Sequence, residues 1–258
     1  MAKLKRLSIN HKLTGDDFAL VWGKGKMPGK AVATSVGPPE NKSTPLAAGS
    51  APPLAFTWRG KSQLPPVGQQ LPFNTCVAHA GARMLESAEA RAGRKIRLDP
   101  EAFHQCVLGR KCELPEPDAA IALTKMQSPG VPRASGFEPG TPCKPGMEKV
   151  ASALVERIIE EKAIKSYIAA TGPVVAVIAV AASFQNIRDA TPYKDKPGQP
   201  TIDHAVLLIG YDDNLGGGVW WFQNSFGTGW GDDGFGTLAY GHGRLLSDPD
   251  HPALCIAA

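Results

Sequence analysis

The chain has 258 residues, of which 43% are hydrophobic and 20% charged, proportions typical of a globular protein with a sizeable core. Its longest apolar run, from Val174 to Ala182, is far too short to cross a bilayer, so we expect no transmembrane segment and no membrane partner. The net charge of +4 comes from residues 1–50, where eight Lys and Arg accompany three Asp and Glu. A basic segment without a matching motif does not indicate a nucleic-acid-binding protein.

The first 52 residues are rich in Gly, Pro, Lys and Ser and contain one short apolar island, Phe18–Trp22. This composition predicts a leader that does not fold by itself. No apolar stretch near Met1 has the length of a secretory signal. We therefore expect a cytoplasmic protein, or one exported without a classical signal, with a single folded domain over residues 53–258.

Two regions of the domain show the 3.6-residue periodicity of helices with one buried side. The first helix is predicted to begin at Cys76, with Asn74 or Thr75 as its cap. The second is predicted over Glu148–Tyr167. The apolar residues expected on its buried side are Val150, Leu154, Val155, Ile158 and Ile159. Proline-rich loops lie between the two helices and contain a weakly helical stretch near residues 118–126.

Beyond the second helix, short apolar segments alternate with turn residues, which is typical of β-strands. The predicted strands are Val174–Val180, Ala205–Tyr211, Val219–Gln223 and Gly234–Tyr240. Helices first and strands second predict an α+β protein with two segregated lobes. We expect a helical lobe over about 75–165 and a β lobe over about 168–258.

The most informative residue is Cys76, because a cysteine at a helix N-terminus lies at the positive end of the helix dipole, which favours the thiolate. His204 and Asn224 lie 128 and 148 residues downstream, in the predicted β lobe. A nucleophile, a base and a group that orients the base are what acyl transfer by cysteine requires. These three residues can meet only across the cleft between the lobes.

The remaining cysteines are Cys106, Cys112, Cys143 and Cys255, and they are compatible with zero, one or two disulfides. His104, Cys106 and Cys112 have a spacing that matches no closed zinc site. We therefore predict no metal and no cofactor, and interpret these cysteines as loop-bracing or buried thiols.

Three further motifs accompany Cys76 in order. Gln70 precedes it by six residues, Asp203-His204-Ala205-Val206 is followed by Gly210-Tyr211, and the segment 224–231 reads Asn-Ser-Phe-Gly-Thr-Gly-Trp-Gly. With these motifs the chain resembles the papain-like cysteine peptidases from Phe56 to about Tyr240. The resemblance implies a two-lobe fold with an antiparallel, β-barrel-like second lobe and an active site in the cleft between the lobes.

The resemblance also implies a role for each matching residue. Cys76 is expected to attack a peptide carbonyl as a thiolate paired with the His204 imidazolium. His204 is expected to protonate the leaving amine, and Asn224 to orient the imidazole. The Gln70 amide and the backbone N–H of Cys76 are expected to form the oxyanion hole.

Four features depart from the pattern of this family. Phe226 replaces the tryptophan usual beside the asparagine, although Trp230 still matches, and both are expected to shield the site. Phe73 stands at a position that is normally cysteine, so we expect the disulfide that braces the nucleophile loop to be missing. Residues 113–117, after Cys112, lack the glycine pair that binds substrate backbone in this family. The leader is also short and lacks the long helical pattern of the common pro-region.

The sequence thus predicts a cysteine endopeptidase whose partners are protein or peptide substrates. We further expect its own residues 1–52 to inhibit it as a zymogen-like segment, the alternative being a tail that makes no contact. Two other functions remain open: a non-catalytic binding protein with the same fold, and a thiol amidase or acyltransferase that acts on another amide.

Overall fold

The computed structural model describes residues 51–116, 118–247 and 250–257. The leader and its apolar island therefore lie outside the described residues, apart from Ala51 and Pro52. Among the described residues, no helix has both the length and the apolar character that crossing a membrane requires.

The larger part of the molecule is built on a seven-stranded antiparallel sheet with the order β4-β9-β5-β6-β7-β8, and β1 pairs with the far end of β6. Its strands are β1 (Ala55–Thr57), β4 (Val155–Ile158), β5 (Val174–Ala181), β6 (Thr201–Asp212), β7 (Val219–Gln223), β8 (Phe235–Ala239) and β9 (Ala253–Ile256). Helix α5 (Glu161–Ala170) packs on β1 and β6. We call this part the sheet lobe; β5 is buried along its whole length.

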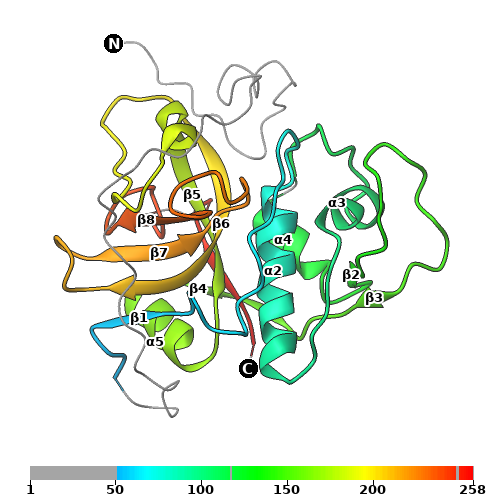
Figure 1. Cartoon of the computed structure of the whole chain (residues 1–258), viewed down its shortest axis with the longest axis horizontal. Coiled ribbons are helices and arrows are strands. Elements are labelled where there is room, and N and C mark those ends of the chain that lie inside the picture. Colours follow the sequence, from blue (N-terminus) through cyan, green and yellow to red (C-terminus); the bar gives the residue numbers. More distant parts are fainter. Residues whose placement is uncertain (1–50, 117, 248–249, 258) are drawn as a thin grey trace.

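The second part, which we call the helical lobe, lies beside the sheet lobe in Figure 1. It contains α2 (Cys76–Arg91), α3 (Pro100–Ala102), a π-helical turn η1 (Phe103–Val107), α4 (Ala119–Thr124) and the hairpin of β2 (Val131–Pro132) with β3 (Lys149–Val150). Helix α2 runs along the boundary and contacts β5 and β6 on one side and α3 and α4 on the other. Most of its residues are consequently buried.

Most of the sequence predictions for secondary structure are confirmed. The helix that begins at Cys76 is present, the weakly helical stretch contains α4, and each predicted strand has its counterpart in β5, β6, β7 or β8. The predicted α+β two-lobe class is also confirmed, because helices and an antiparallel sheet form separate parts of the molecule.

The prediction of a helix over Glu148–Tyr167 is wrong in its first half. Residues 149–158 contain β3 and β4, and the helix begins only at Glu161. Leu154 and Ile159, which were expected on a buried side, are 53% and 80% exposed. The segment is rich in β-branched residues, and β4 pairs with β9 from the end of the chain. Long-range pairing, which local periodicity does not report, decided the structure of this segment.

This pairing also moves the boundary between the lobes. Strand β4 and helix α5 belong to the sheet lobe, so the lobe begins before Val155 and not near residue 168. The sheet lobe further includes β1, which precedes the helical lobe in sequence. The two lobes are therefore segregated in space but interleaved along the chain.

One disulfide is present among the four cysteines that the sequence left open. It joins Cys106 of η1 to Cys143 in the loop between β2 and β3, and thus ties this loop to the helical lobe. Cys112 and Cys255 are buried free thiols, as is Cys76. The expected absence of a disulfide at Phe73 is confirmed, since Cys112 remains reduced.

Candidate active site

The first residue of α2 is Cys76, whose side chain is directed toward the sheet lobe. The residue is 8% exposed. Its sulfur accepts hydrogen bonds from the backbone N–H groups of Ala205 and Val77. Because Ala205 directly follows His204 on β6, this contact brings the cysteine next to the histidine motif.

His204 and Asn224 form the second part of the site. The His204 Nε2 atom lies 2.8 Å from Asn224 Oδ1, and both residues are buried. An amide oxygen only accepts, so Nε2 carries a proton and donates it. In the neutral ring, Nδ1 is then the basic nitrogen. Asn224 follows the last residue of β7, and its Oδ1 also accepts from the Ser225 backbone N–H at 2.8 Å.

Aromatic side chains enclose this histidine. The Phe226 ring lies 4.8 Å from the His204 ring, centroid to centroid, and the Phe184 ring lies 5.7 Å from it. Trp230 packs against both phenylalanines, and its indole N–H donates to the Phe184 carbonyl at 2.9 Å. Phe226 therefore covers the imidazole as expected, and Trp230 supports this cover from behind. Sequence reasoning did not single out Phe184 for this role.

Gln70 is held in place by a residue of the sheet lobe. Its Oε1 accepts from the Ser225 hydroxyl at 2.5 Å, and its Nε2 donates to the Phe73 carbonyl at 2.9 Å. Its backbone N–H donates to the Ser225 carbonyl at 2.7 Å. Gln70 and Asn224 thus belong to one hydrogen-bonded network that crosses between the lobes through Ser225. The motif contained Ser225, but nothing in its spacing revealed this bridging contact.

Burial moves the two reactive groups toward their neutral forms. Burial raises the pKa of the Cys76 thiol well above its ordinary value, and the nearby Glu116 carboxylate raises it further. Burial lowers the pKa of His204 to about 4, against the opposing effect of its hydrogen bond to Asn224. In this structure the site therefore holds a thiol and a neutral imidazole. The helix terminus alone predicts the opposite direction for Cys76.

The lowered pKa of His204 makes stability depend on pH. In the unfolded chain this imidazole takes up a proton below about pH 6.5, whereas in the folded protein it does so only near pH 4. This contribution to stability is present above pH 6.5 and is lost as the pH falls toward 4. Between pH 7 and 4.5 we expect His204 to account for a loss of about 2 kcal/mol. Urea unfolding of the wild type and of His204→Gln at both pH values measures it, and equal losses in the two proteins would contradict it.

The N-terminus of α2 is not capped as the sequence predicted. Thr75 occupies the N-cap position but makes no side-chain hydrogen bond to the helix. The Asn74 side chain donates instead to the Glu113 carbonyl at 2.7 Å. The free N–H groups of Val77 and Ala78 are satisfied by the carboxylate of Glu116, which lies 38 to 39 residues further along the chain. Local sequence gives no sign of this partner.

No group of three or more His, Cys, Asp or Glu side chains suited to a metal ion occurs in the described part of the chain. Of the residues weighed for a zinc site, Cys106 is oxidised in the disulfide, and His104 faces Glu116 and the Lys111 carbonyl. The chemistry available at the site is therefore that of the thiol, the imidazole and the amide groups around them.

Comparison with known proteins agrees with this geometry. A family model for the papain family cysteine proteases matches residues 52–247. Cathepsin K of Mus musculus is 28% identical over 197 residues, which cover 72% of this chain and 60% of that protein. A cysteine proteinase of Trypanosoma brucei brucei is 26% identical over 217 residues, which cover 80% of this chain and 47% of that protein. The chain thus spans less than two thirds of the length of these curated relatives.

A solved structure shows the same fold. A digestive procathepsin L 3 of the Tenebrio molitor larval midgut superposes with a TM-score of 0.69, at 18% identity, over 94% of this chain and 78% of that one. The family match covers both lobes and every motif residue of the site, from Gln70 to Trp230. The chain therefore belongs to the papain family of cysteine proteases.

Proposed function

We propose that this protein is a cysteine peptidase that hydrolyses peptide bonds through an acyl-enzyme on Cys76. The observation that carries the proposal is the junction of α2 with β6. There the Cys76 sulfur accepts from the backbone of Ala205, and the adjacent His204 donates to Asn224 at 2.8 Å. Nucleophile, base and orienting group thus come together from segments more than 100 residues apart in sequence.

In the proposed reaction the Cys76 thiol gives its proton to His204 Nδ1, and the thiolate attacks the carbonyl carbon of the substrate. The backbone N–H of Cys76 and the Gln70 amide donate to the developing oxyanion. His204 then protonates the leaving amine, the C–N bond breaks, and an acyl-enzyme remains. Water, deprotonated by His204, hydrolyses the thioester and restores the thiol.

We also propose that the basic leader suppresses this activity. The support comes from the sequence, in which an apolar island at Phe18–Trp22 interrupts an otherwise polar and basic segment. Apolar residues in such a segment need a protein surface to bury against. A zymogen-like contact over the active site satisfies that need and limits access to a cysteine that is itself 8% exposed.

Active-site titration tests both proposals. An epoxysuccinyl peptide is added to the full-length protein and to a form that begins at Ala51, and mass spectrometry locates the adduct. We expect an adduct on Cys76 in both proteins, formed faster in the shortened form. Equal rates would contradict suppression by the leader and leave the peptidase in place.

A non-catalytic binding protein is the second candidate, favoured by the burial of Cys76 and by the raised pKa of its thiol. If no adduct forms on Cys76 in either protein while both remain folded, this candidate replaces the peptidase. An amidase or acyltransferase uses the same thiol chemistry. An adduct on Cys76 without hydrolysis of any peptide library would favour that function.

A further inference from the structure

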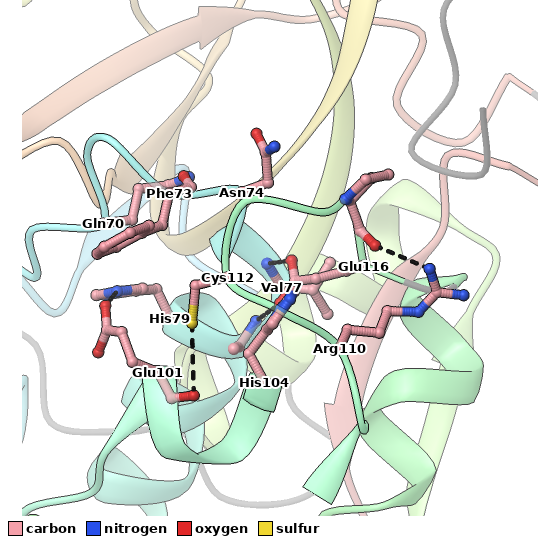
Figure 2. Close-up of polar contacts among 12 residues, drawn as sticks. Gln70, Phe73, Asn74, Val77, His79, Glu101, His104, Arg110, Cys112 and Glu116 are labelled. Carbon is pink, nitrogen blue, oxygen red and sulfur yellow. Dashed lines mark hydrogen bonds and ion pairs between the residues drawn. The ribbon is translucent and has the colours of Figure 1, made fainter. Parts of the chain in front are cut away.

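The loop over residues 112–116 is attached to the nucleophile loop by hydrogen bonds. The Asn74 backbone N–H donates to the Cys112 carbonyl at 2.9 Å, and the Asn74 side chain donates to the Glu113 carbonyl. The Cys112 thiol does not reach across but points toward the Glu101 carbonyl, 3.9 Å away. Figure 2 shows this loop lying over the first turn of α2. Where relatives carry a substrate-binding glycine pair, this chain therefore has a loop that packs inward.

At the end of the loop, the Glu116 side chain is fully buried against α2. One carboxylate oxygen accepts from the Val77 N–H at 2.5 Å, and the other accepts from the Ala78 N–H at 2.6 Å. These N–H groups belong to the two residues that directly follow Cys76. The carboxylate thus occupies the N-terminus of the helix, where the backbone dipoles present their positive end.

The charged groups around Glu116 come from three neighbouring elements. From η1, His104 Nδ1 lies 3.4 Å from Glu116 Oε1, while its Nε2 lies 3.0 Å from the Lys111 carbonyl. Arg110 donates to the Pro115 carbonyl at 3.3 Å and not to the carboxylate. From α2, Cys76 faces the carboxylate, and from β6, His204 lies beyond the cysteine in its neutral form. The side chain that compensates Glu116 is thus His104 (Figure 2).

We propose that Glu116 is a positioning residue of the nucleophile: it fixes the first turn of α2 in place of the missing disulfide, and it sets a negative charge against the thiolate that Cys76 must form. Two hydrogen bonds from consecutive backbone N–H groups hold the carboxylate on this turn. A helix N-terminus ordinarily stabilises a thiolate, but a carboxylate bound there cancels the favourable charge. The raised pKa of Cys76, to which Glu116 contributes after burial, agrees with this reading. The inference rests on the proposed function in one respect, that Cys76 is the reactive nucleophile.

The test is the pH profile of Cys76 alkylation by iodoacetamide in the full-length protein, followed by mass spectrometry of the Cys76 peptide. In Glu116→Gln the side chain keeps its shape and loses its charge. We expect the midpoint of the profile to fall by about one pH unit. The thiolate fraction then rises about tenfold at a fixed lower pH, but a less basic thiolate is a weaker nucleophile, so the rate rises about three- to fourfold.

Glu113→Gln is the matched control, because it removes the same charge from an exposed position in the same loop. Its midpoint should equal that of the wild type. An unchanged midpoint in folded Glu116→Gln overturns the inference. If Glu116→Gln does not fold, His104→Gln decides: loss of the compensating imidazole should raise the midpoint, and an unchanged midpoint overturns the inference.

Peptide hydrolysis, measured in parallel, separates this inference from the proposed function. A lowered midpoint in Glu116→Gln without any peptide hydrolysis supports the role of Glu116 and contradicts the peptidase. Hydrolysis by both proteins with identical midpoints contradicts the role of Glu116 and leaves the peptidase intact.

Discussion

Replacing Cys76 with serine is expected to lower kcat/KM for peptide hydrolysis by at least about 10⁴-fold. Loss of the nucleophile in a comparable acyl-transfer site costs about 10⁶ in turnover, and a serine hydroxyl recovers little of this. The reason lies in the position of the residue: Cys76 alone combines a thiol, the helix N-terminus and the contact with the backbone next to His204. Steady-state hydrolysis of a fluorogenic peptide measures the effect.

Cys112→Ser provides the matched control. Cys112 is a free and buried cysteine of the same lobe, but its sulfur points to the Glu101 carbonyl and away from the site. We expect this variant to retain activity within a few-fold of the wild type. If Cys76→Ser retained activity comparable to that of Cys112→Ser, the acyl-enzyme mechanism would be wrong.

Gln70→Ala is expected to lower kcat by about 10²–10³ and to change KM little. Removing one oxyanion-hole donor typically has this effect, because the lost interaction exists mainly in the transition state. The side chain is suited to the role because its amide is held in a fixed orientation, with Oε1 bound to Ser225 and Nε2 bound to the Phe73 carbonyl. A fixed donor needs no reorganisation as the oxyanion forms.

Two further variants sharpen this experiment. Gln69→Ala removes the exposed amide next to Gln70 and should have almost no effect. Ser225→Ala keeps Gln70 but removes one hydrogen bond that orients it, so we expect a loss of about two- to tenfold in kcat. A loss in Gln70→Ala no larger than that in Gln69→Ala would exclude Gln70 from the oxyanion hole.

The sequence was sufficient for those parts of the fold that local patterns determine. The helix at Cys76 and strands β5 to β8 have strong periodicity, and the motifs around His204 and Asn224 place the two residues within hydrogen-bond distance of each other. The phenylalanine at position 226 was also interpreted correctly, because its ring covers the imidazole.

What sequence reasoning missed depends on contacts between distant segments. Residues 149–158 have a helical pattern but pair as strands because the end of the chain supplies a partner. The N-terminus of α2 has Asn74 and Thr75 before it, both good capping residues, yet a carboxylate from residue 116 takes the position. A single carboxylate in a proline-containing loop carries no periodic or local signal of such a role.

The position of β9 has a consequence for how the protein is made. This strand, at Ala253–Ile256, lies between β4 and β5 in the sheet, so it joins strands that were synthesised about 80 to 100 residues earlier. During translation, the facing edges of β4 and β5 stay unpaired until these residues leave the ribosome. Unpaired strand edges promote aggregation, and long-range pairing of this kind is slow. The nascent chain therefore passes through a stage in which its helical lobe is complete while its sheet is still open to chaperones.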